Sequence, residues 1–131
     1  MALLRAACAA LVIPALTLAC GEDEPVRPPG RTVRLALDEY RITPQAVVVG
    51  EGRIELVVRN EGRLAHDLKV VVPAEEPGDQ PRELGGTATL RPGARGRASV
   101  TVRGAAELEL VCTLANHDDL GQYGTLVVQA R

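Results

Sequence analysis

The sequence has almost no aromatic side chains: its 131 residues include no phenylalanine, no tryptophan and only two tyrosines. Proteins that bind nucleic acid usually combine clustered lysine and arginine with aromatic rings that stack on bases. This chain has no basic stripe, and its formal net charge is −2. We therefore expect no nucleic-acid partner. We also expect a core of valine, leucine and isoleucine, where each fully buried side chain contributes about 1.5–3 kcal/mol.

Long apolar runs are also scarce, and the clearest one lies at the start of the chain. Residues 6–18 are mainly apolar, follow the single cation Arg5, and lead through small residues to Cys20. This pattern is typical of an export signal, and the run is shorter than the roughly 20 residues that span a bilayer. We predict that residues 1–19 are a signal peptide. The alternative is a buried N-terminal helix, which Pro14 disfavours.

Cys20 directly follows this segment and resembles the lipid-modified cysteine of bacterial lipoproteins. The match is imperfect, because Thr17 stands where that pattern prefers leucine. The resemblance implies a lipid anchor at Cys20 and a location on the periplasmic or outer face of the cell envelope; plain secretion is the alternative. Residues 20–31 are acidic and proline-rich, so we predict an extended tether of about 3 Å per residue.

Only three cysteines are present, namely Cys8, Cys20 and Cys112. The first falls in the predicted signal and the second is the predicted anchor. Cys112 would then be a lone thiol in an exported domain, where cysteines usually pair. Metal ligation would explain why it is kept.

From residue 32 onward the sequence consists of short alternating runs without sustained helical periodicity, the pattern of β-strands. Residues 73–86 form a long polar stretch that we expect to be a loop. The pattern predicts one all-β domain over residues 32–131, a two-sheet Greek-key sandwich. About eight strands are expected, at residues 32–37, 45–50, 54–60, 68–72, 87–90, 98–102, 108–112 and 124–128.

Two strands at the C-terminal end enclose a short polar loop with potential metal ligands. Cys112, His117 and Gln122 follow one another with four residues between each pair, and the only other histidine is His66. One thiolate and two imidazoles with a weak axial fourth donor suit a copper ion that changes oxidation state. We expect these four side chains to hold one copper ion, Cu²⁺ or Cu⁺.

Two separated motifs resemble those of the cupredoxins, the small blue-copper proteins. NEGRLAHDL, residues 60–68, is similar to the segment with the family's first histidine ligand. CTLANHDDLGQYGTLVV, residues 112–128, is similar to its C-terminal ligand loop. The resemblance spans about residues 32–128. It implies that His66, Cys112 and His117 bind copper and that the protein is a one-electron carrier of the cell envelope, not an enzyme.

Gln122 stands where most of these proteins have methionine. The Cys-x4-His-x4-Gln spacing resembles the stellacyanin-type site, which implies ligation by the side-chain oxygen of Gln122 and a lower reduction potential. The disulfide of those plant proteins cannot form here. Asn116 also replaces the glycine that commonly precedes the second histidine.

Three acidic residues flank the expected ligands. Asp67 stands where relatives have an asparagine that supports the ligand loop, so it could accept a backbone N–H from that loop; it could equally be a solvated turn residue. Asp118 and Asp119 adjoin His117 and would favour a cationic redox partner such as a cytochrome or oxidase. The alternative for both is a solvated polar loop. We expect a monomer.

Other functions remain open from the residues alone. A copper-binding or delivery protein could use the same ligands, but such proteins tend to use exposed methionine, and Met1 is the only one here. An enzyme with Cys112 as nucleophile lacks an accompanying oxyanion loop or helix N-terminus. A structural zinc site would be unusual with glutamine.

Overall fold

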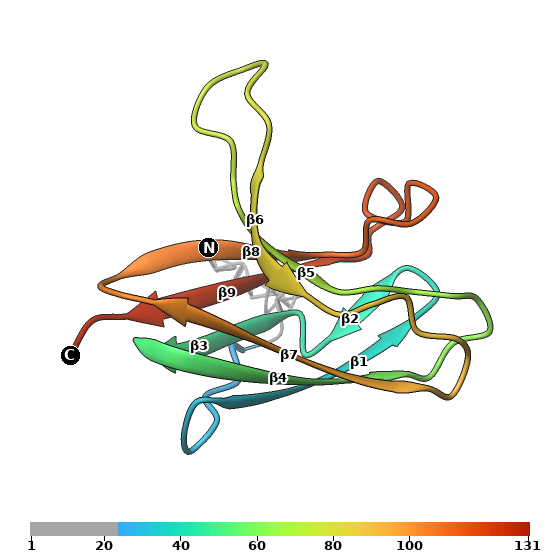
Figure 1. Ribbon diagram of the computed structural model, residues 1–131, viewed down its shortest axis with the longest axis horizontal. Coiled ribbons are helices and arrows are strands. Elements are labelled where there is room, and N and C mark those ends of the chain that lie inside the picture. The colour runs from blue at the N-terminus through green and yellow to red at the C-terminus, as the bar shows by residue number, and fades with distance from the viewer. Residues whose placement is uncertain (1–23) are drawn as a thin grey trace, which may run out of the picture.

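The computed structural model describes residues 24–131 and shows nine β-strands arranged as two facing sheets (Figure 1). The predicted signal peptide and Cys20 lie outside the described residues. Within residues 24–131 no helix is long and apolar enough to cross a membrane. The strands are β1 (Thr32–Asp38), β2 (Arg41–Thr43), β3 (Ala46–Gly50), β4 (Gly52–Asn60), β5 (Lys69–Val72), β6 (Arg82–Gly86), β7 (Arg95–Val102), β8 (Ala106–Val111) and β9 (Tyr123–Gln129).

The predicted two-sheet β-sandwich is confirmed. One sheet has the strand order β2-β1-β4-β7 and the other β3-β9-β8-β5-β6. The pairs β1–β4 and β3–β9 are parallel, and the other neighbours are antiparallel. These non-consecutive orders require connections that cross between the sheets, as in Greek-key sandwiches.

The core between the sheets is aliphatic, as the lack of phenylalanine and tryptophan predicts. Strands β1, β4, β8 and β9 alternate buried and more exposed positions, so every second side chain of these strands points inward. In β1 the buried residues are Val33, Leu35 and Leu37, and in β4 they include Ile54 and Leu56. Leu110 and Leu126 from the other sheet, and Leu68 immediately before β5, are also fully buried. This alternation fixes the faces of the strands and therefore the positions of the loops that follow them.

The prediction for residues 73–90 was wrong in two places. Residues 82–86, expected to be loop, form β6, and residues 87–90, expected to be a strand, do not. β6 has no β-branched residue and ends in two glycines, so its sequence lacks the strand pattern. A Cβ at Gly86 would overlap the carbonyl oxygen of Leu68, which explains glycine where the two backbones approach closely.

Residues 87–90 instead cross from one sheet to the other, between β6 and β7. Within this crossing, Thr87 Oγ1 accepts a hydrogen bond from the Leu68 N–H (3.1 Å). Leu90 forms a single antiparallel bridge with His66. The crossing segment therefore holds the stretch that contains the first expected ligand.

The chain contacts the sandwich ahead of the predicted domain start. The Val26 N–H donates to the Ala46 carbonyl, and the Val26 carbonyl accepts from the Val48 N–H, both at 2.9 Å, along the edge of β3. The predicted tether, residues 20–31, thus includes a segment that is hydrogen-bonded to the domain.

Three connections gather at one end of the sandwich, on the right in Figure 1. They are the β1–β2 turn, the β4–β5 connection and the β8–β9 loop. We call this the ligand end, because it contains all four expected metal ligands.

Candidate metal centre

Cys112 immediately follows β8, and His117 lies within the tight β8–β9 loop. The His117 N–H donates to the Leu114 carbonyl (2.9 Å), and the His117 carbonyl accepts from the Gln122 N–H (2.9 Å). The Cys112 N–H donates to the Gln122 carbonyl at 3.2 Å. These bonds fold the loop back on itself, so that the side chains of Cys112 and His117, five positions apart in sequence, face each other.

The fold of this loop requires two successive left-handed residues, Ala115 (φ 48°) and Asn116 (φ 57°). Glycine adopts this conformation freely and asparagine tolerates it better than most other residues. Asparagine can therefore occupy the position where the related loops commonly have glycine.

His66 lies in the β4–β5 connection. Its N–H donates to the Leu90 carbonyl (3.1 Å), and its carbonyl accepts from the Leu90 N–H (2.7 Å). The buried amide of Asn60 donates to the Leu64 carbonyl (2.8 Å) and to the Leu90 carbonyl (2.9 Å). Asn60 thus ties the end of β4 to both segments around His66. These contacts fix the backbone of the first expected ligand.

The structure brings His66, Cys112 and His117 together in the interior. The Cys112 Sγ is 3.6 Å from His117 Nδ1 and 3.9 Å from His66 Nδ1, and the two Nδ1 atoms are 3.2 Å apart. His66 and Cys112 are completely buried, and His117 is 6% exposed. All three donor atoms lie within 4.8 Å of one another, so one ion could contact all of them.

The chemistry of these donors fits a cation. Burial raises the pKa of the Cys112 thiol, and backbone N–H groups of Asp67 and Leu114 only partly oppose this effect. A thiolate is therefore unfavourable here unless a positive charge lies beside it. The two facing Nδ1 atoms also cannot both carry protons at 3.2 Å without repulsion. A bound metal ion would satisfy all three groups.

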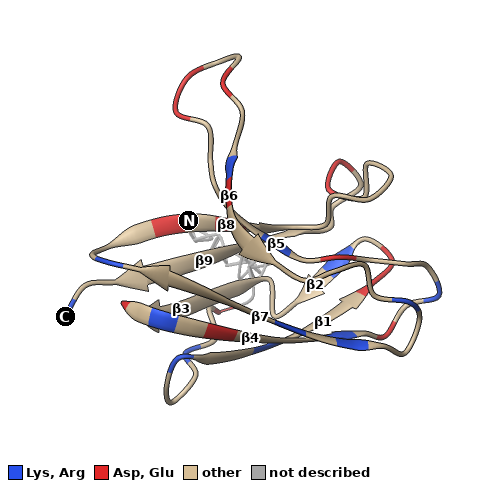
Figure 2. Ribbon diagram, in the orientation of Figure 1, with Lys and Arg blue, Asp and Glu red and all other residues tan. Residues whose placement is uncertain are grey.

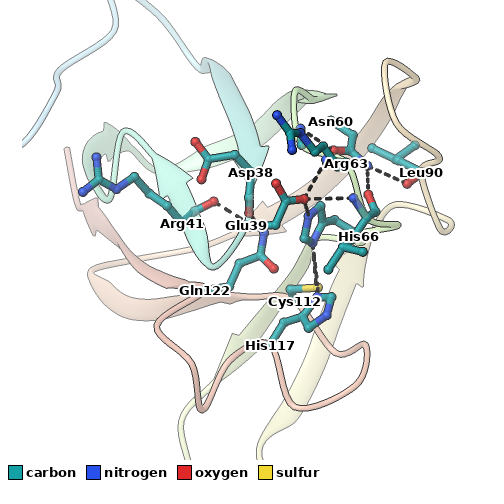
Figure 3. A network of polar contacts seen from close by, with 12 residues as sticks. Asp38, Glu39, Arg41, Asn60, Arg63, His66, Leu90, Cys112, His117 and Gln122 are labelled. Carbon is teal, nitrogen blue, oxygen red and sulfur yellow. Dashed lines mark hydrogen bonds and ion pairs between the residues drawn. The ribbon is translucent and has the colours of Figure 1, made fainter.

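Gln122 is fully buried at the same end of the sandwich, and Figure 3 shows its side chain between the β1–β2 turn and the β8–β9 loop. Its Nε2 donates to the Asp38 carbonyl (2.8 Å) and, at 3.4 Å, to the Arg41 carbonyl. Its Oε1 is buried without a hydrogen-bond partner among the described residues. Such an oxygen is costly unless something else binds it. The amide is therefore held by its nitrogen, while its oxygen is available to a ligand.

Asp67 has the supporting contacts expected from its position. It is 4% exposed, and its carboxylate accepts from both the N–H (2.7 Å) and the hydroxyl (2.6 Å) of Thr113. Because Thr113 follows Cys112 directly, Asp67 fixes the backbone next to the thiol. This confirms a buried, loop-supporting acid and excludes a solvated one.

Two neighbours of the site were missed by the sequence analysis, Glu39 and Tyr40 in the β1–β2 turn. The Tyr40 ring meets the His117 ring edge-on, with centroids 5.3 Å apart. Glu39 Oε1 accepts from the N–H groups of Arg63 (2.7 Å) and Leu64 (2.9 Å) and lies 3.3 Å from His66 Nε2. The turn has no local motif that marks these roles, which depend entirely on how the strands pair.

Comparison with known proteins supports the architecture. No protein-family model and no curated protein sequence matches the chain. Among solved structures, a reduced auracyanin from Roseiflexus castenholzii has a TM-score of 0.66 at 19% identity, covering 76% of this chain and 97% of that one. Auracyanin A from Chloroflexus aurantiacus, described as a blue copper protein, has a TM-score of 0.64 at 16% identity. That match covers 81% of this chain and 100% of the auracyanin. An azurin from Methylomonas sp. strain J has a TM-score of 0.63 at 12% identity, covering 75% of this chain and 97% of the azurin.

Sequence identities this low show a shared fold and do not by themselves show a shared function. The His66–Cys112–His117 cluster independently fits the ligand set of a blue copper protein, because its donors are one thiol and two imidazoles in a buried position. The structure and the comparisons together establish that this chain has the cupredoxin fold.

Proposed function

We propose that the protein binds one copper ion through His66, Cys112 and His117 and acts as a one-electron carrier. The convergence of three buried donors within 4.8 Å, at one end of a cupredoxin sandwich, carries this proposal. Copper supplies the change of oxidation state, between Cu²⁺ and Cu⁺. The protein supplies one thiolate and two imidazoles, the donor set typical of electron-transfer copper sites.

The way the ligands are held supports electron transfer. Thr113 is fixed by Asp67, the His66 backbone is paired with Leu90, and the loop is closed by Gln122. Ligands that are fixed by several hydrogen bonds before binding need to move little when the charge of the site changes. Little movement favours fast gain and loss of an electron.

The burial of the site disfavours the alternative functions. A copper-delivery protein needs donors that a partner can reach, whereas Cys112 and His66 are fully buried. A nucleophilic enzyme would need substrate access to Cys112, which the same burial prevents. His117, at 6% exposed, is the ligand nearest to solvent and would be the exit for the electron.

We also propose Gln122 Oε1 as the axial donor. The support is its burial without a hydrogen-bond partner while Nε2 is anchored to the Asp38 carbonyl. An amide oxygen in place of a thioether favours the cupric state, so the reduction potential would be lower than with methionine.

The location and the partner are proposals from the sequence. We propose export to the cell envelope and a lipid anchor at Cys20, which mass analysis of membrane-extracted protein would test. Asp118 and Asp119 are exposed next to His117 and would favour a cationic cytochrome or oxidase. Figure 2 shows acidic residues in the β8–β9 loop and residues of both charges on the neighbouring β1–β2 turn and β4–β5 connection.

The decisive experiment is copper loading. With one equivalent of Cu²⁺ the protein should turn intensely blue or green and bleach reversibly with ascorbate. Cys112→Ser should abolish the colour, because the thiolate is the source of the charge-transfer absorption. Tight binding without colour would favour copper handling over electron transfer, and failure to take up copper would overturn the proposal.

A further inference from the structure

The far side of the His66 ring faces a carboxylate. His66 directs Nδ1 toward Cys112 and His117, so its other nitrogen, Nε2, points away from the candidate metal position. Glu39 Oε1 lies 3.3 Å from Nε2, and both atoms belong to segments far apart in sequence (Figure 3). If Nδ1 binds a metal ion, Nε2 is the nitrogen left to carry the ring proton, and Glu39 Oε1 is the acceptor within reach of it.

The position of Glu39 is fixed independently of His66. The same Oε1 accepts from the backbone N–H groups of Arg63 and Leu64 at 2.7 and 2.9 Å, which are both shorter than the contact with His66. Both donors are backbone groups of the β4–β5 connection, so these bonds do not depend on the His66 ring. The carboxylate is therefore held in place before any metal binds.

The adjacent backbone leaves room for this carboxylate. A Cβ at Gly62 would overlap Glu39 Oε1, so only glycine at this position allows the observed contact. Among residues 24–131 no lysine or arginine lies within ion-pair distance of Glu39, whose one such partner is His66. The negative charge is thus directed at the imidazole and is not neutralised by a neighbouring cation.

We propose that Glu39 is a positioning residue that fixes the orientation of the His66 ring and makes Nδ1 a stronger donor, which lowers the reduction potential of the site. A carboxylate that accepts the proton of a ligating histidine increases the basicity of the opposite nitrogen. A stronger, more negative donor stabilises Cu²⁺ more than Cu⁺. This inference rests on the proposed copper function, and Glu39 would act on the metal only through His66.

The first test needs no copper. Nitrogen-15 NMR of the metal-free protein should show the His66 tautomer with the proton on Nε2. Glu39→Gln should keep this tautomer, since its amide oxygen can still accept the proton. Glu39→Ala and Gly62→Ala should shift the tautomer equilibrium, because one removes the acceptor and the other displaces it. An unchanged His66 signal in well-folded Glu39→Ala would overturn the positioning role.

The second test measures the reduction potential of the copper-loaded protein. Glu39→Gln keeps the shape but removes the charge, and we expect it to weaken Cu²⁺ binding about tenfold relative to Cu⁺. For a one-electron couple this raises the potential by about 59 mV. The matched control is Glu61→Gln, which removes the same charge from the β4–β5 connection that contains His66; Glu61 lies 3.6 Å from Arg59 and forms no ion pair with His66.

The outcomes separate the two proposals. If Glu39→Gln and Glu61→Gln give the same potential, the role of Glu39 is wrong although the copper function stands. If the unmodified protein forms no coloured copper site, the proposed function fails, and the tautomer measurement still decides whether Glu39 orients His66. Because Glu39→Gln retains an acceptor for the two backbone N–H groups, it should fold even where Glu39→Ala does not.

Discussion

Asp67 and Thr113 are joined by two hydrogen bonds across the ligand end, at 2.7 Å to the Thr113 N–H and 2.6 Å to its hydroxyl. Asp67 directly follows His66, and Thr113 directly follows Cys112. This pair therefore connects the two segments that supply the candidate ligands. It holds the β4–β5 connection against the start of the β8–β9 loop. The site is therefore organised by contacts between its neighbours as well as by the ligands themselves.

Asp67→Ala should destabilise the metal-free protein. Hydrogen bonds to a charged group contribute about 1.5–3 kcal/mol, and this substitution removes both bonds to Thr113. Urea unfolding followed by far-ultraviolet circular dichroism would measure the loss. Thr113→Val, which removes only the hydroxyl, should cost less. Equal losses in the two variants would show that the backbone bond contributes little.

Gln122→Met should raise the reduction potential and lower the stability. Methionine would replace the proposed axial oxygen with a weaker donor, and it also removes the hydrogen bond to the Asp38 carbonyl, worth about 0.5–1.5 kcal/mol. Voltammetry and denaturant unfolding would measure the two effects separately. Gln129→Met, at an exposed position near the C-terminus, is the control. A potential unchanged by Gln122→Met would remove Gln122 from the site.

Asn116 should tolerate glycine but not a β-branched residue. At φ 57° a side chain branched at Cβ is strained, so Asn116→Val should cost about 1–2 kcal/mol, whereas Asn116→Gly should be nearly neutral. Thermal unfolding of both variants would test this. If valine were tolerated as well as glycine, the loop could not require a left-handed residue at this position.

Glu51 should make stability depend on acid pH at the opposite end of the sandwich. Its carboxylate accepts from the N–H groups of Gly104 (2.6 Å) and Arg131 (3.1 Å), and these bonds, that from Gly104 first, lower its pKa in the folded protein. The stabilisation is present above the unfolded pKa of about 4.5 and is lost as the pH falls through the lower folded value.

Glu51→Gln should therefore reduce the slope of unfolding free energy against pH in the acid range. Urea unfolding at a series of pH values below neutrality would measure it. Glu107→Gln, an exposed glutamate of β8, should leave the slope as it is in the unmodified protein. A slope unaffected by Glu51→Gln would show that the Gly104 contact contributes nothing to acid sensitivity.

The sequence by itself determined the elements that depend on local pattern. Alternation in segments such as residues 32–37 and 54–60 predicted strands, because a strand between a core and solvent must alternate apolar and polar side chains. The spacing of Cys112, His117 and Gln122 predicted a ligand loop, because these residues share one short connection. His66 was assigned by its motif, and the structure places it beside the other two.

Only the tertiary structure decided the features that depend on pairing between distant segments. β6 is an edge strand of exposed and half-buried residues that ends in two glycines, so it has no alternating core face to reveal it. Residues 87–90 alternate like a strand but must cross between the sheets. Glu39 meets His66 only because β1 pairs with β4 in parallel and brings the turn after one strand to the connection after the other. Its role depends on this pairing of distant strands, which no local sequence pattern specifies.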